Sequence, residues 1–304
     1  MKIYKEYISI VMIILVVGLS FLYWYVEISN RIGFLYSTED SSYKLEVENY
    51  NLKLYSLNEN EISEKEIKYL KSLGINFLIG PNYSENGLRI YPYLEKYDMI
   101  SFSPTISSDE LLTLTERIFS LTPSNEMQIS AIVKFLQDEK VSNVLLILDP
   151  FNRTYSDEYL RILNYIKGDY IYYYNLNAIL KNNLNIRNYD AILITTNSSK
   201  AADIISFIGS DFEGIFILAD SAIDIGLEKL NVNKNKIFFV SFTKNPFNAT
   251  LELNYETLDL VSSHKFISTQ QALRFFTGNT YYFNEKRTLN REIRIVNLSD
   301  IQGD

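Results

Sequence analysis

Short apolar runs alternate with amphipathic stretches from residue 32 to about residue 240. This alternation is typical of repeated strand and helix units, so it predicts an α/β fold with mostly parallel sheets. Nearly all of the runs are continuously apolar, as expected for strands that helices cover on both faces. The predicted strands are residues 32–36, 52–57, 77–79, 99–102, 144–148, 170–174, 191–194, 215–218 and 237–240.

The amphipathic stretches between these runs have recognisable helix ends. Ser63 and Glu66 have the spacing of a capping box, and Gly74 stands where a helix commonly stops. Further helices are expected at 125–139, between Ser156 and Gly168, and from Ser198 or Ser199 to Gly209. Near the C-terminus, residues 255–264 and 268–276 have a helical pattern, and the alternation over 278–298 predicts a terminal hairpin.

Residues 7–26 form an uncharged apolar run that is long enough, at 1.5 Å per residue, to cross a hydrocarbon core of about 30 Å. Lys2 and Lys5 precede this run, and Glu27 follows it. The positive-inside bias then predicts a cytoplasmic segment 1–6, a single transmembrane anchor, and an extracytoplasmic domain, periplasmic or extracellular. A cleaved signal peptide ending near Gly18 and Ser20 is the main alternative, and a buried core helix is another.

Composition excludes several classes of function. A chain of 304 residues with 47% hydrophobic residues is long enough for about two compact units. The net charge of −8 argues against nucleic-acid binding, which depends on Lys and Arg neutralising phosphates. The absence of cysteine excludes disulfides, thiolate metal sites and cysteine nucleophiles, and the single histidine, His264, leaves little for zinc or a catalytic triad. We therefore expect no metal and no cofactor.

No common catalytic signature occurs in the sequence, including the Walker loop, G-x-S-x-G, H-E-x-x-H and G-x-G-x-x-G. Acidic residues gather at Asp211, Glu213, Asp220 and Asp224, and most of them are interpreted as solvated loop charges. A hydrolase that uses these carboxylates is thus disfavoured, and we expect no catalytic residues.

The most specific pattern lies between residues 77 and 124. It consists of IGPNYS at 79–84 and SPTIS at 103–107, each at the end of an apolar strand, followed by IFSLTPS at 118–124. This order resembles the type I periplasmic solute-binding proteins, specifically the group that binds branched-chain amino acids for ABC transporters. In that family the segment that 118–124 resembles is the crossover into the second lobe, and Ser120 stands where the family usually has arginine.

Weaker matches follow in the family's order. They are VLLILD at 144–149, YDAI at 189–192, ADS at 219–221, YET at 255–257 and the closing segment 278–296. The resemblance covers about residues 32–298 and implies two lobes, each a mostly parallel sheet flanked by helices. It assigns 30–121 and 255–283 to an N-terminal lobe, and 122–254 and 284–304 to a C-terminal lobe. Two stretches are short for this family, between the first strand and Leu52 and between Val240 and Tyr255, so the chain resembles a shortened, membrane-anchored member.

The resemblance implies binding of a small polar solute, most simply an amino acid, between the lobes, for delivery to an ABC permease and without enzymatic activity. By similarity, the Ser84 and Ser107 hydroxyls and the Thr105 backbone hold the α-carboxylate, and Asp220 pairs with the α-ammonium. The segments that match the family's ligand pocket contain Tyr83, Asn152, Tyr155, Thr196 and Asn197.

The same residues also have simpler structural interpretations. Ser84, Ser103 and Ser107 are also ordinary helix-capping residues, as serines after strands often are, and Asp220 is placed to cap a following helix. The alternative function is a membrane-anchored sensor or interaction module with a degenerate binding-protein fold and no role in transport.

Overall fold

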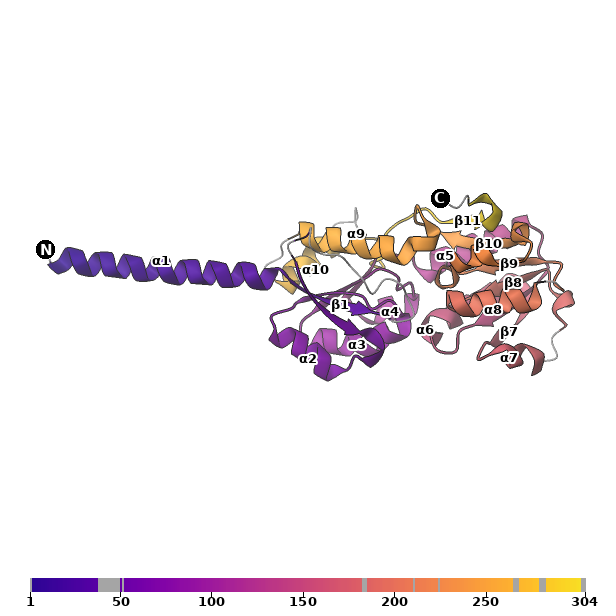
Figure 1. The fold of residues 1–304 in the computed structure, drawn as a ribbon, viewed down its shortest axis with the longest axis horizontal. Coiled ribbons are helices and arrows are strands. Elements are labelled where there is room, and N and C mark those ends of the chain that lie inside the picture. The colour runs from indigo at the N-terminus through magenta and orange to yellow at the C-terminus, as the bar shows by residue number, and fades with distance from the viewer. Residues whose placement is uncertain are drawn as a thin grey trace.

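Two sheets, each flanked by helices, form the body of the protein in the computed structural model, and α1 (Lys2–Ser29) projects from this body (Figure 1). The structure describes residues 2–37, 50, 52–181, 185–209, 211–223, 225–264, 268–278 and 283–301. Within these ranges, the side chains of residues 2–9, 24, 25, 28, 29, 178, 180, 181 and 225 are not described.

The first sheet has five parallel strands in the order β2-β1-β3-β4-β5. Its strands are β1 (Arg31–Tyr36), β2 (Lys53–Asn58), β3 (Phe77–Ile79), β4 (Ile100–Ser103) and β5 (Ile118–Ser120). The helices that alternate with them are α2 (Glu64–Ser72), α3 (Ser84–Lys96) and α4 (Asp109–Leu114), with the 3-10 turn η3 (Glu59–Glu61).

The second sheet has six strands in the order β11-β10-β9-β8-β6-β7, and only β11 is antiparallel to its neighbour. Its strands are β6 (Asn143–Leu148), β7 (Lys167–Tyr172), β8 (Ala191–Ile194), β9 (Ile215–Leu218), β10 (Ile237–Ser241) and β11 (Arg294–Asn297). The helices are α5 (Asn125–Asp138), α6 (Arg153–Ser156), α7 (Leu176–Lys181) and α8 (Ser198–Ile208). The 3-10 turns are η4 (Asp157–Asn164), η5 (Ile186–Asn188), η6 (Asp220–Ala222), η7 (Ile225–Lys229), η8 (Lys234–Lys236), η9 (Pro246–Asn248) and η10 (Leu298–Asp300).

After β10 the chain returns to the first sheet through α9 (Ala249–Ser263) and α10 (Thr269–Gly278). Leu253 of α9 and Phe276 of α10 are buried in one apolar cluster with Phe102 of β4. The rings of Phe102 and Phe276 lie 5.2 Å apart, centroid to centroid. We call the first sheet with α2–α4, α9 and α10 lobe 1, and the second sheet with α5–α8 lobe 2. Connections between them follow β5, β10 and α10, and α9 runs alongside both (Figure 1).

The sequence pattern located most of these elements. Strands 77–79, 191–194 and 215–218 match residue for residue, and the capping box is present, with Lys65 N donating to Ser63 Oγ at 3.3 Å and Ser63 N donating to Glu66 Oε2 at 3.1 Å. The strand predicted at 170–174 is β7, which begins earlier because its register with β6 starts at Lys167.

Three expectations about secondary structure were wrong. β5 lies within the stretch interpreted as a crossover, and the helix expected after Ser156 is the 3-10 turn η4. The helix predicted from Ser198 or Ser199 is α8, which begins at Ser198 as expected, and Asn197 caps it because its Oδ1 accepts from Lys200 N at 3.1 Å. No hairpin is described at 283–301, since β11 pairs with β10 instead. In addition, α9 begins at Ala249, so the stretch that looked too short for a helix contains η9 and the start of α9.

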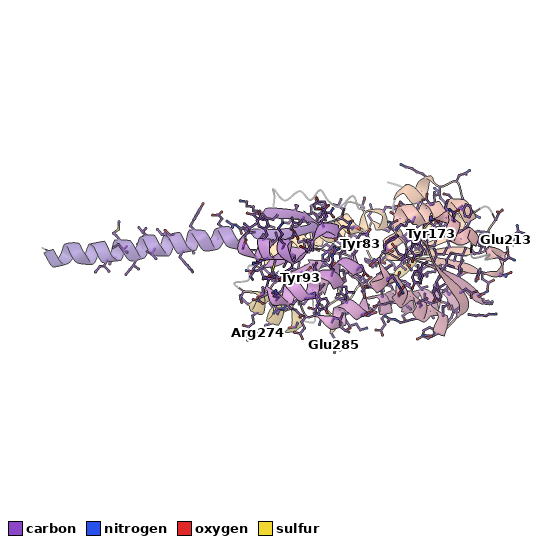
Figure 2. All side chains as sticks on the ribbon, turned by 90° about the horizontal axis from the view of Figure 1, so that it is seen from below. Tyr83, Tyr93, Tyr173, Glu213, Arg274 and Glu285 are labelled. Atoms are coloured by element: carbon purple, nitrogen blue, oxygen red, sulfur yellow. The ribbon has the colours of Figure 1, made fainter. Side chains whose placement is uncertain are left out.

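The predicted anchor corresponds to α1, a helix of 28 residues. Its described side chains are those of 10–23, 26 and 27. The helix projects away from the two sheets (Figure 2), and near its end Glu27 Oε1 accepts from Arg31 Nη2 of β1 at 2.9 Å. Within the described part of the chain, no helix meets the length and apolarity needed to cross a membrane. The side chains of the predicted segment 1–6, and several of those in 7–26, lie outside the described residues. The predicted membrane crossing is therefore not confirmed.

Candidate ligand-binding site

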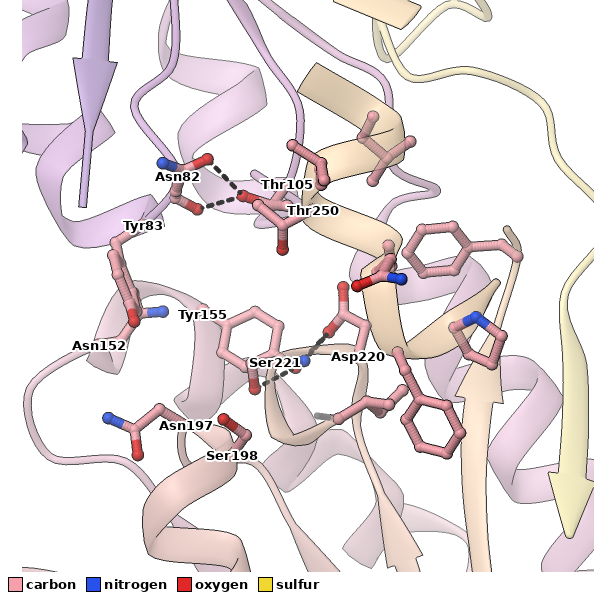
Figure 3. A pocket seen from close by; sticks show the side chains of 18 of the residues that line it. Asn82, Tyr83, Thr105, Asn152, Tyr155, Asn197, Ser198, Asp220, Ser221 and Thr250 are labelled. Atoms are coloured by element: carbon pink, nitrogen blue, oxygen red, sulfur yellow. Dashed lines mark hydrogen bonds between the residues drawn. The ribbon is translucent and has the colours of Figure 1, made fainter. Parts of the chain in front are cut away.

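A cavity of about 120 Å³ lies between lobe 1 and lobe 2 (Figure 3). Its walls come from the ends of strands in both sheets and from the first turn of α9. The lining residues are Asn82, Tyr83, Ser84, Thr105, Asn152, Tyr155, Asn197, Ser198, Asp220, Ser221, Ile223, Phe242, Pro246, Phe247, Asn248, Ala249, Thr250, Leu251 and Leu253. Tyr83 lies at the junction of the two lobes, whereas Tyr173 and Glu213 lie within lobe 2 (Figure 2).

The cavity follows from the parallel topology. Ser84 comes just after β3, Thr105 after β4 and Asp220 after β9. The carboxyl ends of parallel strands lie at one edge of a sheet, and open α/β sheets bind their ligands there. Two such edges, one from each lobe, meet in this protein.

The lobe 1 wall depends on the turn after β3. Gly80 has φ of +92°, and an added Cβ would lie 2.5 Å from the Leu35 carbonyl oxygen, so only glycine fits this turn. The following residues are held by hydrogen bonds from the turn after β4. Ser103 Oγ donates to the Pro81 carbonyl at 2.6 Å, and Thr105 Oγ1 donates to the Asn82 carbonyl at 2.8 Å. These bonds fix Asn82 in the cavity wall.

The lobe 2 wall is organised around the half-buried carboxylate of Asp220. Tyr155 donates to its Oδ1 at 2.6 Å, and Gln128 Nε2 donates to its Oδ2 at 3.0 Å. The amide nitrogen of Ser221 also donates to Oδ1 at 3.0 Å. Burial raises the pKa of Asp220, and the hydrogen bonds from Tyr155 and Gln128 oppose that rise. Burial, with Asp220 nearby, raises the pKa of the Tyr155 phenol well above its ordinary value, so Tyr155 stays protonated and donates.

Charge in the cavity is one-sided. Among the described residues that line it, Asp220 is the only carboxylate, and none is lysine, arginine or histidine. The remaining polar groups are hydroxyls, amides and phenols, including Ser84 at the start of α3, where the N-cap residue Tyr83 makes no side-chain capping bond. The arrangement offers one anionic acceptor for a cation and neutral donors opposite it.

Hydrogen bonds cross between the lobes beside the cavity. Asn152 Oδ1 accepts from Glu85 N at 3.1 Å, and Glu85 Oε2 accepts from Thr154 Oγ1 at 2.6 Å. Farther along the same interface, the buried carboxylate of Glu158 accepts from Asp109 N at 3.1 Å and from Glu110 N at 2.8 Å, at the first turn of α4. These bonds hold the lobes together around the cavity.

Comparison with known proteins identifies solved structures with the same architecture. No protein-family model matches the chain, and no curated protein is significantly similar to it in sequence. Among solved structures, the chain is similar to the branched-chain amino acid transporter substrate-binding protein LivJ of Streptococcus pneumoniae in complex with isoleucine. The TM-score is 0.72 at 12% identity, and the match covers 90% of this chain and 97% of LivJ. The fold is that of a type I periplasmic solute-binding protein.

Other neighbours have the same architecture. The leucine-binding protein LivK of Thermotoga maritima matches with a TM-score of 0.71 at 13% identity, over 89% of this chain and 99% of LivK. A solute-binding protein of an ABC transporter from R. palustris, in complex with benzoate, matches with a TM-score of 0.66 at 9% identity, over 88% of this chain and 93% of that chain. The resemblance noted in the sequence is therefore confirmed for the fold.

The structure brings together most of the residues predicted to bind the solute. The predicted residues that line the cavity are Tyr83, Ser84, Thr105, Asn152, Tyr155, Asn197 and Asp220. Thr196 does not line it and is fully buried. Ser103 has the simpler role, because its Oγ accepts from Ile106 N at 2.9 Å and so caps the turn after β4.

Ser107, which was expected to hold the α-carboxylate, does not line the cavity. Its side chain is fully buried and Oγ has no hydrogen-bond partner. The reason is the path of the chain after β4: Ser108 caps α4, and the carbonyl of Ser107 accepts from Asn125 N at 2.7 Å. Ser107 is thereby turned toward the start of α5 and away from the cavity.

Sequence reasoning missed the wall formed by residues 242–253. This segment includes Phe242, Phe247, Thr250 and Leu251, and it carries no recognisable motif. One signal was available: Phe242 directly follows β10, so the strand-end rule that located Ser84 and Asp220 applies to it as well. Asp224, the last member of the acidic cluster, lies outside the described residues. Among the residues that the structure describes, no cluster of three or more Asp, Glu, His or Cys side chains could hold a metal ion.

Proposed function

We propose that the protein is an extracytoplasmic solute-binding component of an ABC-type transporter and binds an amino acid between its lobes. The observation that carries the proposal is the position of Asp220, the single carboxylate among the described lining residues, across the cavity from Thr105 (Figure 3). An α-ammonium group pairs with Asp220, and the α-carboxylate accepts from the hydroxyls and from the start of α3. The amino-acid complexes among the structural neighbours support the same class of ligand.

The Asp220 carboxylate also argues against an aromatic acid as the ligand, the kind of compound bound by the R. palustris neighbour. Benzoate is an anion without a cationic group. Placing it beside Asp220 would bring two negative charges together in a cavity with no basic side chain among its described lining residues, which is unfavourable in a partly desolvated site. A zwitterion avoids this repulsion.

Isothermal titration calorimetry of the full-length chain in detergent micelles tests the proposal. The titrants are amino acids, with benzoate as an anionic control. We expect an amino acid to bind and benzoate not to bind. Asp220→Asn, which keeps the shape of the side chain and removes its charge, should weaken amino-acid binding at least about tenfold. Benzoate binding with no response to any amino acid would contradict the proposal.

The alternative, a membrane-anchored sensor without a transport role, has the same binding site and a different partner. Uptake of a radiolabelled ligand by cells lacking the protein distinguishes the two. A transporter component predicts that deletion lowers uptake and that Asp220→Asn fails to restore it. Unchanged uptake in the deletion strain, with ligand binding intact in the purified protein, would favour the sensor.

We also propose that α1 anchors the protein in the cell membrane, with the lobes outside the cytoplasm. Its described apolar side chains are exposed on all faces of the helix, including Ile14 at 66%, Phe21 at 64% and Leu22 at 58%. A helix that is apolar all round needs a lipid or protein environment. Lys2 and Lys5 on one side set the proposed orientation.

The absence of native cysteine makes the location directly measurable. An Asn30→Cys variant should react with a membrane-impermeant maleimide on intact cells, and an Ile3→Cys variant should react only after the membrane is opened. The intact mass of the purified protein separates an anchor from a cleaved leader. Labelling of Ile3→Cys on intact cells would contradict the orientation.

A further inference from the structure

The cavity is small for the ligands of the structural neighbours. We infer that the solute is an amino acid of the size of glycine, alanine or serine, and that Leu251 at the start of α9 excludes larger side chains; this rests on the function proposed above. The inference concerns the size of the ligand, which the fold and the position of Asp220 leave open.

The volume sets the upper limit. An engineered apolar cavity of about 150 Å³ accommodates benzene, a molecule of about six non-hydrogen atoms. The cavity here measures about 120 Å³ on the comparable scale. Alanine has about as many non-hydrogen atoms as benzene. Leucine is larger than alanine by an isopropyl group and exceeds this space.

The cavity has polar groups on its lobe 1 wall and on its lobe 2 wall, so neither wall provides an apolar surface for a ligand side chain. Asp220 already accepts from Tyr155, Gln128 and Ser221, so its two oxygens retain capacity for about one further donor. On the lobe 1 side, Asn82 lines the cavity, is 7% exposed, and has a buried Nδ2 without a hydrogen-bond partner. Protein atoms cover this Nδ2, so its missing partner is a cost of the lobe 1 wall and not a contact for the ligand.

Residues of η9 and of the start of α9 form a further wall of the cavity. Phe247 lies within the wall and packs against Phe239 of the lobe 2 core, with ring centroids 6.4 Å apart. Leu251 is half-buried, and Leu253, two residues on, is fully buried in the lobe 1 core. Because Leu253 fixes this end of α9, the wall at Leu251 cannot retreat without disturbing that core.

The cross-lobe bonds oppose widening of the cavity by a small displacement of one lobe. The bonds that Asn152 accepts from Glu85, and Glu85 from Thr154, join the starts of α3 and α6 next to the cavity. A larger ligand would have to break them. The size limit thus belongs to the closed arrangement of the two lobes.

Calorimetry of the full-length chain with glycine, L-alanine, L-serine, L-leucine and L-isoleucine tests the inference. We expect at least one of the three small amino acids to bind at least about tenfold more tightly than leucine or isoleucine, a ratio within the range found for exclusion of extra methylene groups. Leu251→Ala should shift the leucine-to-alanine affinity ratio by at least about tenfold toward leucine. Leu251→Val is the milder variant if the alanine variant unfolds.

Leu114→Ala is the matched control, because it makes the same truncation on an exposed position of α4 that does not line the cavity. It should leave the affinity ratio unchanged. Leucine or isoleucine binding as tightly as alanine to the unaltered chain would overturn the size limit and leave the proposed function standing. An unchanged ratio in both Leu251 variants would overturn the role of Leu251. If no amino acid binds, the proposed function itself fails.

Discussion

The backbone nitrogen of Glu85 in lobe 1 donates to the side-chain oxygen of Asn152 in lobe 2, and the Glu85 carboxylate accepts in return from Thr154. Backbone N–H groups at the starts of α3 and α6 thus find their hydrogen-bond acceptors on the opposite lobe. Amides that would otherwise face solvent are paired only while the lobes are closed. The hydrogen bonding of these two helix starts is therefore coupled to the opening and closing of the two lobes.

Glu85→Ala should favour the open arrangement. The variant loses the bonds that Thr154 makes to the carboxylate, which contribute about 1 kcal/mol at this exposed position, equivalent to about a fivefold change in the closing equilibrium. Small-angle X-ray scattering should show a larger radius of gyration, and ligand affinity should fall by about the same factor. Glu95→Ala, an exposed change on the same helix, is the control. Identical scattering curves for both variants would contradict the role of this contact.

Ligand affinity should depend on the charge of Asp220. Because burial raises its pKa above the ordinary value, the carboxylate becomes protonated at a higher pH than a solvent-exposed aspartate does. The affinity for an amino acid should therefore fall as pH decreases through this raised pKa, measured by calorimetry between pH 7 and pH 4. In Asp220→Asn this pH dependence should disappear. A pH-independent affinity in the unaltered protein would argue against contact between Asp220 and the ammonium group.

The same group affects folding stability with the opposite trend. A carboxyl whose pKa is higher in the folded state stabilises the fold in its protonated form. Its contribution is fully present below the unfolded pKa and is lost as pH rises through the folded pKa. The free energy of unfolding from urea titrations should thus decline less with rising pH in Asp220→Asn than in the unaltered protein. Parallel curves for the two proteins would contradict this linkage.

Glu158 should be among the most sensitive positions at the interface. Its buried carboxylate accepts from two amides of α4 and from Asn125 Nδ2 at 2.7 Å, so Glu158→Ala leaves several buried donors without partners. We expect a loss of about 2–4 kcal/mol in the free energy of unfolding. Glu158→Gln keeps an acceptor of the same shape and should cost less. Urea denaturation of the two variants provides the test, and equal losses would contradict it.

Ser107 and Ser84 provide a direct check on which serine contacts the ligand. Ser107→Ala removes a buried hydroxyl that has no partner, so ligand affinity should stay the same and stability should stay equal or rise by up to about 1 kcal/mol. Ser84→Ala removes a hydroxyl that lines the cavity and should weaken binding several-fold. Calorimetry of the two variants measures both effects. Loss of binding in Ser107→Ala alone would restore Ser107 to the site.

Much of the fold was predictable because parallel strands covered on both faces are continuous apolar runs. β8 and β9 show this, since all but one of their side chains are buried. β5 was not recognised because its three residues lie inside a motif that indicated a crossover. The last segment alternates like a hairpin, yet β11 pairs with β10 from far earlier in the chain, and such long-range pairing leaves no local signal.

The site was predictable to the extent that it follows strand ends. Ser84, Thr105 and Asp220 each stand just after a strand, and parallel topology brings such positions to one edge. Ser107 fails because position after a strand does not determine which way a side chain turns. Leu251 was missed because it reaches the cavity on a helix that returns from lobe 2 to lobe 1, and no residue pattern marks that return.

The course of α9 divides recognition between two independent parts of the molecule. Leu251 belongs to a helix whose later residues, Leu253 and Leu258, are anchored in the lobe 1 core, whereas Asp220 belongs to a strand end of lobe 2. In the proposed site, one lobe therefore sets how large a ligand is accepted and the other sets its charge. Because the two positions belong to different lobes, ligand preference can be retuned, in evolution or in the laboratory, along one property while the other is preserved.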